Sequence, residues 1–387
     1  MFGKPVTLFR IFGFEVKIDW SWLILGALIV WSLATGLFPI WFKGIDRGSY
    51  WIMGAAGAVG LFLSIVFHEL WHSLIARRFG LNMRGITLFL FGGVSEMADE
   101  PPSSKAEFFL ALAGPASSVI LGAIFLAASY LLGGIFLGAV HLVRGGGSLT
   151  PTNAVLSYLG GLNLVLAVFN LIPAFPLDGG RVLRAILWGA WNDLRRATRV
   201  ASSIGAGLGA GLMFLGVVQF LMGGSVGGIW TFIIGMFVRS AARSSYRQLL
   251  FRQALEGARV KQFMVKDPVT VGPRTSVAKL VDDFIYKYHF KMYPVVDGEK
   301  LVGCVTLDQV KTVARDEWPV HSVGELARAC APDNTIAPES DVTAALAQMQ
   351  RTGRSRLLVA EGGRLDGVIS LKDIMGYIAL KLDLEEQ

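Results

Sequence analysis

The chain has 387 residues, of which 53% are hydrophobic and only 17% are charged, and its formal net charge is +7. Soluble globular proteins carry about a quarter charged residues, so this composition excludes a chain that is soluble throughout. The length allows two or three domains. The two cysteines, Cys304 and Cys330, are too few for a disulfide scaffold, and we expect two free cytosolic thiols.

Long apolar runs fill residues 1–245, whereas residues 246–387 have the composition of a soluble protein. Six runs have nearly the length, or more, that a helix needs to cross about 30 Å of hydrocarbon, so we expect about six transmembrane helices. They lie at 20–42, 51–76, 106–140, 152–174, 199–222 and 226–242. The first run is too long for a signal-peptide core and is predicted to stay uncleaved. The third is over-long, and Gly133-Gly134 is predicted to mark where it leaves the bilayer.

Lysine and arginine indicate the orientation. With a cytoplasmic N-terminus, the outside loops receive only Lys43, Arg47 and Arg144, and every other Lys and Arg of residues 1–247 falls on the cytoplasmic side. The positive-inside rule favours this arrangement, which predicts a multi-pass protein of the cell membrane with a cytoplasmic C-terminal half. The same rule accounts for the net charge, and no nucleic-acid partner is expected.

The motif HELWH, residues 68–72, lies inside the second apolar run. On a helix, His68 and His72 share one face about 5–6 Å apart, where two neutral imidazoles can bind one zinc ion. Glu69 is placed to act as general base on a water molecule. Three ionisable side chains at membrane depth are costly without a compensating metal. The alternative is a polar helix face that lines a pore.

Residues 84–98, RGITLFLFGGVSEMA, predict a β-hairpin. Ile86, Leu88 and Leu90 alternate with other side chains, and Gly92-Gly93 supplies a turn. Backbone edges at membrane depth need cover from protein or from a water-filled cavity. A membrane-associated hairpin and a plain cytoplasmic hairpin both remain open.

A catalytic zinc site needs a third protein ligand. The remaining histidines, His141, His289 and His321, fall in an outside loop or in the soluble half. Asp178 stands out among the acids, in the segment NLIPAFPLDGGR at the end of the fourth run. Two prolines break the helix there and two glycines permit a tight turn, so the carboxylate can face inward. The alternative is that Asp178 caps a helix at the cytoplasmic surface.

The soluble half contains an internal repeat. KMYPVVDGEKLVGCVTLDQV and SRLLVAEGGRLDGVISLKDI share an apolar strand, a turn with glycine, a second strand, and Thr306 or Ser370 before a helix. The predicted organisation is a membrane domain at 1–245, a helical linker at 246–258, and two repeat domains at 259–316 and 317–387.

These motifs together resemble the site-2 proteases, specifically the bacterial and archaeal branch with a C-terminal pair of CBS domains. HELWH at 68–72, AGPASS at 113–118, NLIPAFPLDGGR at 170–181 and the repeat carry the resemblance, which covers nearly the whole chain. It implies a polytopic α-helical membrane protein with a membrane-associated hairpin, plus an α/β CBS pair.

The resemblance also implies an activity. The chain would be an intramembrane zinc metalloendopeptidase with His68, His72 and Asp178 as ligands and Glu69 as base. Asn170 would position the substrate carbonyl or stabilise the oxyanion. The hairpin would pair with an unwound substrate as an added strand. Substrates of the family are single transmembrane segments, often of membrane-tethered transcription regulators, cleaved in regulated intramembrane proteolysis.

CBS pairs commonly bind ATP, ADP or AMP, and they often form dimers. The resemblance places a ribose contact at Ser370 and Asp373, with Thr306 as the corresponding hydroxyl of the first repeat. Gln309 stands where the first repeat should have its acid, which puts one nucleotide site in doubt. The alternative is a module for folding and dimerisation that binds no ligand.

Two other functions compete with the protease. A CBS-regulated channel or transporter predicts the same helices and basic loops, but it leaves HELWH and LDGG as coincidences. A pseudoprotease scaffold is disfavoured because every expected catalytic residue is present.

Overall fold

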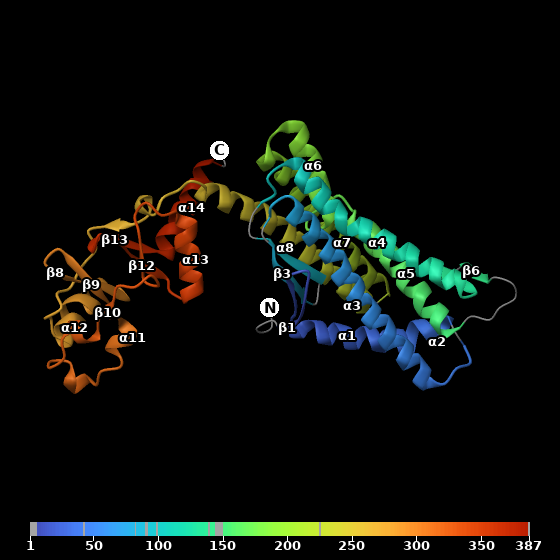
Figure 1. Cartoon of the computed structure of the whole chain (residues 1–387), viewed down its shortest axis with the longest axis horizontal. Helices are drawn as coiled ribbons and strands as arrows, with labels where there is room; N and C mark the ends of the chain where they lie inside the picture. Colours follow the sequence, from blue (N-terminus) through green and yellow to red (C-terminus); the bar gives the residue numbers. More distant parts are fainter. Residues whose placement is uncertain are drawn as a thin grey trace. The chain divides into compact units, whose positions relative to one another are not determined.

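The computed structural model describes residues 6–41, 43–81, 83–89, 92–97, 100–137, 140–143, 150–223 and 226–385. The chain divides into two compact units, Met1–Arg247 and Gln248–Gln387. Figure 1 shows long helices with a small sheet in the first unit, and short strands with shorter helices in the second. Lys4 and Arg144, which contribute to the charge asymmetry, lie outside the described residues.

Five helical segments of the described chain are long and apolar enough to cross a membrane. They are α1 (Trp20–Ser32) continued by η1 (Leu33–Leu37) and α2 (Phe38–Trp41), then α3 (Arg47–Arg78), α4 (Ser104–Leu131), α5 (Pro151–Asn170) and α7 (Leu194–Gly223). The sixth apolar run forms the first half of α8 (Val226–Leu255), which is outside this group of five. The expectation of a polytopic helical membrane protein is therefore confirmed.

Polar side chains fix where these helices begin. Asp19, Asp46, Ser103 and Thr150 each accept a hydrogen bond from a backbone N–H in the first turn of the helix that follows. The donor–acceptor distances are 2.9 Å for the two aspartates and 3.2 Å for the serine and the threonine. Each cap satisfies one of the N–H groups that a helix start leaves unpaired.

The third apolar run does not form one helix. α4 ends at Leu131, Gly133 takes a positive φ of 106°, and an antiparallel hairpin follows, made of β5 (Gly134–Leu137) and β6 (Val140–Val143). The expected exit point is therefore close to the observed helix end, but strands rather than helix occupy the residues beyond it. Hydropathy alone did not distinguish the helix from the strands that follow it, because short apolar runs fit a helix and a buried strand equally well.

The predicted hairpin is half of a larger sheet. β3 (Met83–Phe89) and β4 (Gly92–Met97) pair antiparallel, β1 (Val6–Ile11) and β2 (Phe14–Ile18) form a second hairpin, and β2 joins β3 in parallel. The strand order is β1-β2-β3-β4. Leu90, which belongs to the predicted alternation, lies outside the described residues.

One face of this sheet packs on α3. Phe14, Val16, Ile86 and Leu88 are buried against α3 residues that include Leu70. Burial alternates along β2, as expected for a strand whose side chains point to opposite faces. The sheet therefore supports the helix that carries the two motif histidines.

The second unit repeats one hairpin. β8 (Met292–Asp297) pairs with β9 (Lys300–Thr306), and β12 (Arg356–Glu361) pairs with β13 (Arg364–Ser370). β8 and β12 have the same order of buried and exposed positions, and both pairs shift register at the equivalent point. The predicted repeat is confirmed at the level of strand register.

The repeats share a seven-stranded sheet in the order β10-β9-β13-β12-β11, to which β7 and β8 also pair. Each buried cluster combines residues of both repeats, and the cluster of the second repeat also includes Ala254 and Leu255 of α8. The elements not yet named are α6 (Asp178–Trp191), η2 (Val260–Gln262), β7 (Val265–Lys266), α9 (Val277–Lys279), η3 (Leu280–Ile285), α10 (Tyr286–Tyr288), α11 (Leu307–Val310), η4 (Arg315–Glu317), α12 (Val323–Leu326), β10 (Arg328–Ala329), β11 (Thr335–Ile336), α13 (Val342–Thr352) and α14 (Leu371–Glu385).

Candidate metal centre

Two imidazoles lie together on α3. His68 and His72 are one turn apart, both are buried, and their Nε2 atoms are 3.2 Å from each other. The i, i+4 spacing of HELWH places them on one helix face, as the sequence predicts. In a segment of this hydropathy, two buried imidazoles require polar partners.

Asp178 completes a three-residue cluster. Its Oδ2 atom lies 3.2 Å from Nε2 of His68 and 3.2 Å from Nε2 of His72. The ligand atoms of all three residues lie within 4.8 Å of one another. The carboxylate is the first residue of α6, so it both occupies a helix start, where negative charge is favourable, and faces the histidines.

Two glycines allow α6 to begin at this point. A Cβ atom added at Gly179 would overlap the backbone carbonyl of Leu171. One added at Gly180 would come within 2.8 Å of the carbonyl oxygen of Ala174. The chain after α5 therefore folds back so closely that there is no room for a side chain at Gly179 or Gly180. This reversal brings Asp178 to the histidines.

One face of α4 holds the histidines in place. Ser118 Oγ lies 2.9 Å from Nδ1 of His68, and the carbonyl oxygen of Leu110 lies 2.7 Å from Nδ1 of His72. Gly114 stands midway between Leu110 and Ser118, so the three recur every four residues and share a helix face. In the sequence, Gly114 and Ser118 are visible only as part of AGPASS, and no signal marks Leu110, which acts through its backbone.

The donor set fits zinc. A carbonyl oxygen only accepts hydrogen bonds, so Nδ1 of His72 carries the proton in its bond to Leu110, and the neutral ring offers Nε2 to a metal. Ligand distances of about 2.0–2.1 Å in a tetrahedral zinc site put neighbouring ligand atoms about 3.3 Å apart. The observed separations of 3.2 Å agree with that value. Because a glycine faces the imidazoles, the space in front of both Nε2 atoms stays clear.

A buried ion pair joins α4 to α6. Arg184 donates from Nε to Glu107 Oε1 at 2.7 Å and donates to the same oxygen through a terminal nitrogen. Glu107 is fully buried and Arg184 is 7% exposed. Arg181 Nε lies 3.9 Å from that oxygen. Asp178 begins the same helix, so the pair fixes the segment that presents it. In the sequence, both arginines serve only as topology signals, and the one signal for this pair is Glu107, an acid inside an apolar run that we did not predict to be functional.

The other predicted residues of the membrane unit lie beside the cluster in sequence or at a helix end. Glu69 follows His68 on α3 and is half-buried. Asn170 is the last residue of α5, and its amide nitrogen donates to the carbonyl of Leu166 at 3.0 Å. That bond uses one of the two N–H groups of the amide nitrogen.

In the second unit, the predicted ribose residues form local helix caps. Ser370 N–H and Oγ both donate to a carboxylate oxygen of Asp373, and Asp373 N–H donates back to Ser370 Oγ at 3.3 Å. Thr306 makes the equivalent interaction with Gln309, whose Oε1 accepts from Thr306 N–H at 2.8 Å. Gln309 therefore replaces an acid without loss of the cap, which is the structural role of this spacing.

Known proteins match both units. Residues 56–146 and 132–214 match Peptidase family M50, and residues 260–315 and 323–380 match the CBS domain. Rip3 of Mycobacterium tuberculosis is 37% identical over 377 residues, which cover 96% of this chain and 92% of that protein. Zinc metalloprotease MJ0392 of Methanocaldococcus jannaschii is 30% identical over 382 residues, which cover 99% and 98%. The solved site-2 protease from Methanocaldococcus jannaschii is 30% identical and has a TM-score of 0.42, over 63% of this chain and 95% of that one.

Proposed function

Because this chain belongs to the site-2 protease family, peptidase family M50, and ends in a CBS pair, we propose that it cleaves the transmembrane segments of membrane-tethered proteins. The chain is a membrane-embedded zinc metalloprotease of that family. The observation that carries the proposal is the cluster of His68, His72 and Asp178, whose two histidines are buried on a helix long and apolar enough to cross a membrane.

His68, His72 and Asp178 hold the zinc ion in this proposal. Two features support the assignment. The hydrogen bonds to Nδ1 of both histidines turn their Nε2 atoms toward Asp178. Gly114 keeps the space beside those atoms free of side chain. Bound zinc supplies Lewis-acid chemistry, which polarises a carbonyl group and makes water more acidic.

The residues of the chain perform the remaining steps. The Glu69 carboxylate takes a proton from the attacking water and then delivers it to the nitrogen of the leaving amine. Asn170 orients the carbonyl of the scissile peptide through its side-chain amide. A substrate helix must unwind first, because its own hydrogen bonds enclose its peptide bonds. Strand β4, which lies at one end of the described sheet order, offers a backbone edge to the unwound segment.

The substrate is a single-pass transmembrane protein, such as a membrane-tethered transcription regulator, presented within the lipid bilayer. The N-terminus and the CBS pair face the cytoplasm, as the distribution of Lys and Arg favours. In this topology, the regulatory unit lies on the same side of the membrane as the domain that a cut substrate would release.

The CBS pair binds an adenine nucleotide and forms a homodimer in this proposal. Ser370 and Asp373 contact the ribose, and Thr306 marks the weaker first site. Each of these residues lies where a strand ends and a helix begins. A cavity of about 520 Å³ in the same unit is lined by other residues, among them Lys261, Asp267 and Asp366.

A Glu69→Gln variant tests the proteolytic function. Proteomics of native membranes should show transmembrane fragments or full-length precursors that accumulate in the variant but not in the wild type. The variant should retain its zinc, because Glu69 is assigned as base and not as ligand. A channel or transporter would show no change in membrane-protein fragments, and that result would remove the protease assignment.

Asp178→Ala tests the ligand set, with Asp193→Ala as the matched control. Asp193 also stands at a helix start, where it accepts from the N–H of Arg196, but it is exposed and is not part of the cluster. Metal analysis should find less zinc in the first variant and wild-type zinc in the second. Full zinc occupancy in Asp178→Ala would exclude Asp178 as a ligand.

A further inference from the structure

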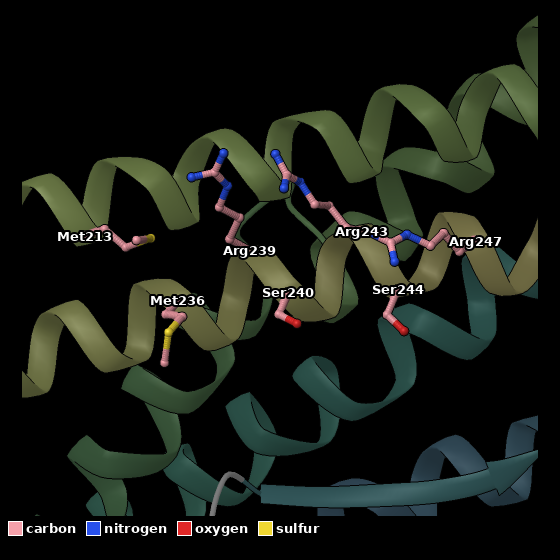
Figure 2. A pocket seen from close by; sticks show the side chains of 7 residues that line it. All are labelled: Met213, Met236, Arg239, Ser240, Arg243, Ser244 and Arg247. Atoms are coloured by element: carbon pink, nitrogen blue, oxygen red, sulfur yellow. The ribbon is translucent and has the colours of Figure 1, made fainter. Parts of the chain in front are cut away.

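A cavity of about 490 Å³ lies beside α7 and α8, and arginines line much of it. Arg239, Arg243 and Arg247 follow one another at intervals of four residues on α8, so they share one face of the helix. Met213 of α7 and Met236 of α8 line it as well. Figure 2 shows Arg243 and Arg247 leaning back along α8 toward Arg239, in the direction in which helical side chains point.

Glycines bring the two helices into backbone contact next to this cavity. A Cβ atom added at Gly209 of α7 would lie 2.6 Å from the backbone nitrogen of Arg239 and 2.7 Å from the carbonyl oxygen of Gly235. Small residues at such positions let membrane helices approach closely. Side chains cannot enter a contact of this kind, so the arginines lie along its flank, where a ligand can reach them.

The cavity has an excess of positive charge. Its lining includes no carboxylate, and the three arginines form no ion pair with any residue that the structure describes. In contrast, Arg199 of α7 donates to the hydroxyl of Tyr246 at 2.9 Å. Like charges four residues apart on a helix repel one another. An anion bound among the guanidinium groups would relieve that repulsion.

The guanidinium groups suit a phosphate. A phosphate group accepts hydrogen bonds on several oxygens, and arginine matches its geometry with two parallel N–H donors. Ser240 and Ser244 also line the cavity and are exposed, but Figure 2 shows their hydroxyls on the other side of α8 from the arginine side chains. The three guanidinium groups are therefore the part of the lining that suits a phosphate ester.

The position along the helices identifies which phosphate ester fits. Toward the end of α7 and the start of α8, large apolar side chains are exposed, such as Phe214 at 72%, Leu221 at 76% and Trp230 at 52%. Such a surface faces lipid in a membrane protein. Along α8 the lining changes from Met236 to Arg239 within one turn, which is the order of acyl chain and headgroup in a phospholipid.

We propose that this cavity binds the headgroup of an anionic phospholipid, with the phosphate held by Arg239, Arg243 and Arg247 and an acyl chain lying past Met213 and Met236. A basic pocket between membrane helices is the type of site that selects acidic lipids. The bound lipid would hold α8 at a fixed depth in the membrane at the point where this helix leaves the apolar region.

Native mass spectrometry of the full chain in detergent tests the proposal, with phosphatidylglycerol, phosphatidylcholine and inorganic phosphate as separate probes. The wild type should retain one phosphatidylglycerol in preference to phosphatidylcholine. The Arg243→Gln/Arg247→Gln double variant should bind it about 25-fold more weakly, since each basic side chain near an anionic lipid surface contributes about fivefold. The Arg243→Lys/Arg247→Lys variant, which keeps the charge, should recover part of the affinity.

The Arg78→Gln/Lys105→Gln double variant is the charge-matched control. Both residues are exposed basic positions at the ends of other helices of this unit, and both lie outside the cavity. This variant should bind phosphatidylglycerol like the wild type. Equal weakening in both double variants would attribute binding to overall charge and overturn the proposal. Saturation by inorganic phosphate without retention of lipid would also overturn it, as would equal retention of phosphatidylcholine. Equal melting temperatures in phosphatidylcholine nanodiscs would show that each variant is folded.

Discussion

Replacing Gly114 by alanine is expected to expel the metal without disturbing the membrane fold. The added methyl carbon would lie 2.5 Å from Nε2 of His68 and closer still to Nε2 of His72. Favourable contacts between carbon atoms lie at about 3.5–4.0 Å, so each imidazole would have to move by about 1 Å. Neither ring can do so freely, because hydrogen bonds from α4 hold both Nδ1 atoms.

The expected magnitude follows from that displacement. Disturbing the groups that orient metal ligands commonly weakens metal binding about 10- to 100-fold. Here both histidines are displaced and the methyl group also fills the metal's own space, so we expect at least about a 100-fold loss, or about 2.7 kcal/mol. Proteolysis should fall with zinc content.

The assay is zinc content per chain after dialysis against a graded series of chelator concentrations. Gly161→Ala is the matched control, because nothing lies within 4 Å of a Cβ atom at that position of α5. The control should hold zinc and melt like the wild type, and both variants should keep the wild-type helical content measured without metal. If Gly114→Ala retained one zinc with an unchanged chelator midpoint, the geometric argument for the site would be refuted.

Three further predictions concern groups outside the ligand set. Ser118→Ala should weaken zinc binding about 10- to 100-fold, measured by the same chelator titration, because it removes a hydrogen-bond partner of one histidine. Glu107→Gln should destabilise the chain by about 3–5 kcal/mol, seen as a lower melting temperature, because it removes the close buried counter-charge of Arg184 and leaves only Glu100, whose Oε2 lies 3.8 Å away; adding Arg184→Met should recover most of the loss. Maleimide at neutral pH should label Cys330, which is exposed, and spare Cys304, because the reagent cannot reach a buried thiol; equal labelling of both in the folded chain would contradict the buried position.

The lengths of the apolar runs were sufficient to predict the five long apolar helices, although not the strands that follow the third, and the spacing of HELWH was sufficient to predict the histidine pair. The spacing of HELWH places His68 and His72 on one face of any helix, whatever surrounds it. The end of the apolar run before Asp178, with its prolines and glycines, marked a carboxylate at a chain reversal. The CBS repeat was visible because two hairpins of equal length recur with the same pattern of apolar residues.

Contacts between distant segments were not predictable in the same way. The hairpin β1–β2 joins β3 through a parallel pairing of β2 with β3. Helices α1 to α3 separate these two strands in the sequence, and neither strand carries a local signal of its partner. Residues 134–137 and 140–143 form strands although their composition continued the preceding apolar run. Such pairings depend on which surfaces meet in three dimensions, and a single sequence does not state that.

The sequence by itself determined the chemistry that the candidate metal centre offers, because the spacing of the two histidines is a property of one helix and Asp178 follows a visible break in the chain. The tertiary structure decided how that chemistry is held. The face of α4 formed by Leu110, Gly114 and Ser118 acts through a backbone carbonyl, an absent side chain and a hydroxyl, none of which marks a functional residue in isolation. Their roles follow from the packing of α4 against α3, since only that packing brings them within hydrogen-bonding distance of the imidazoles.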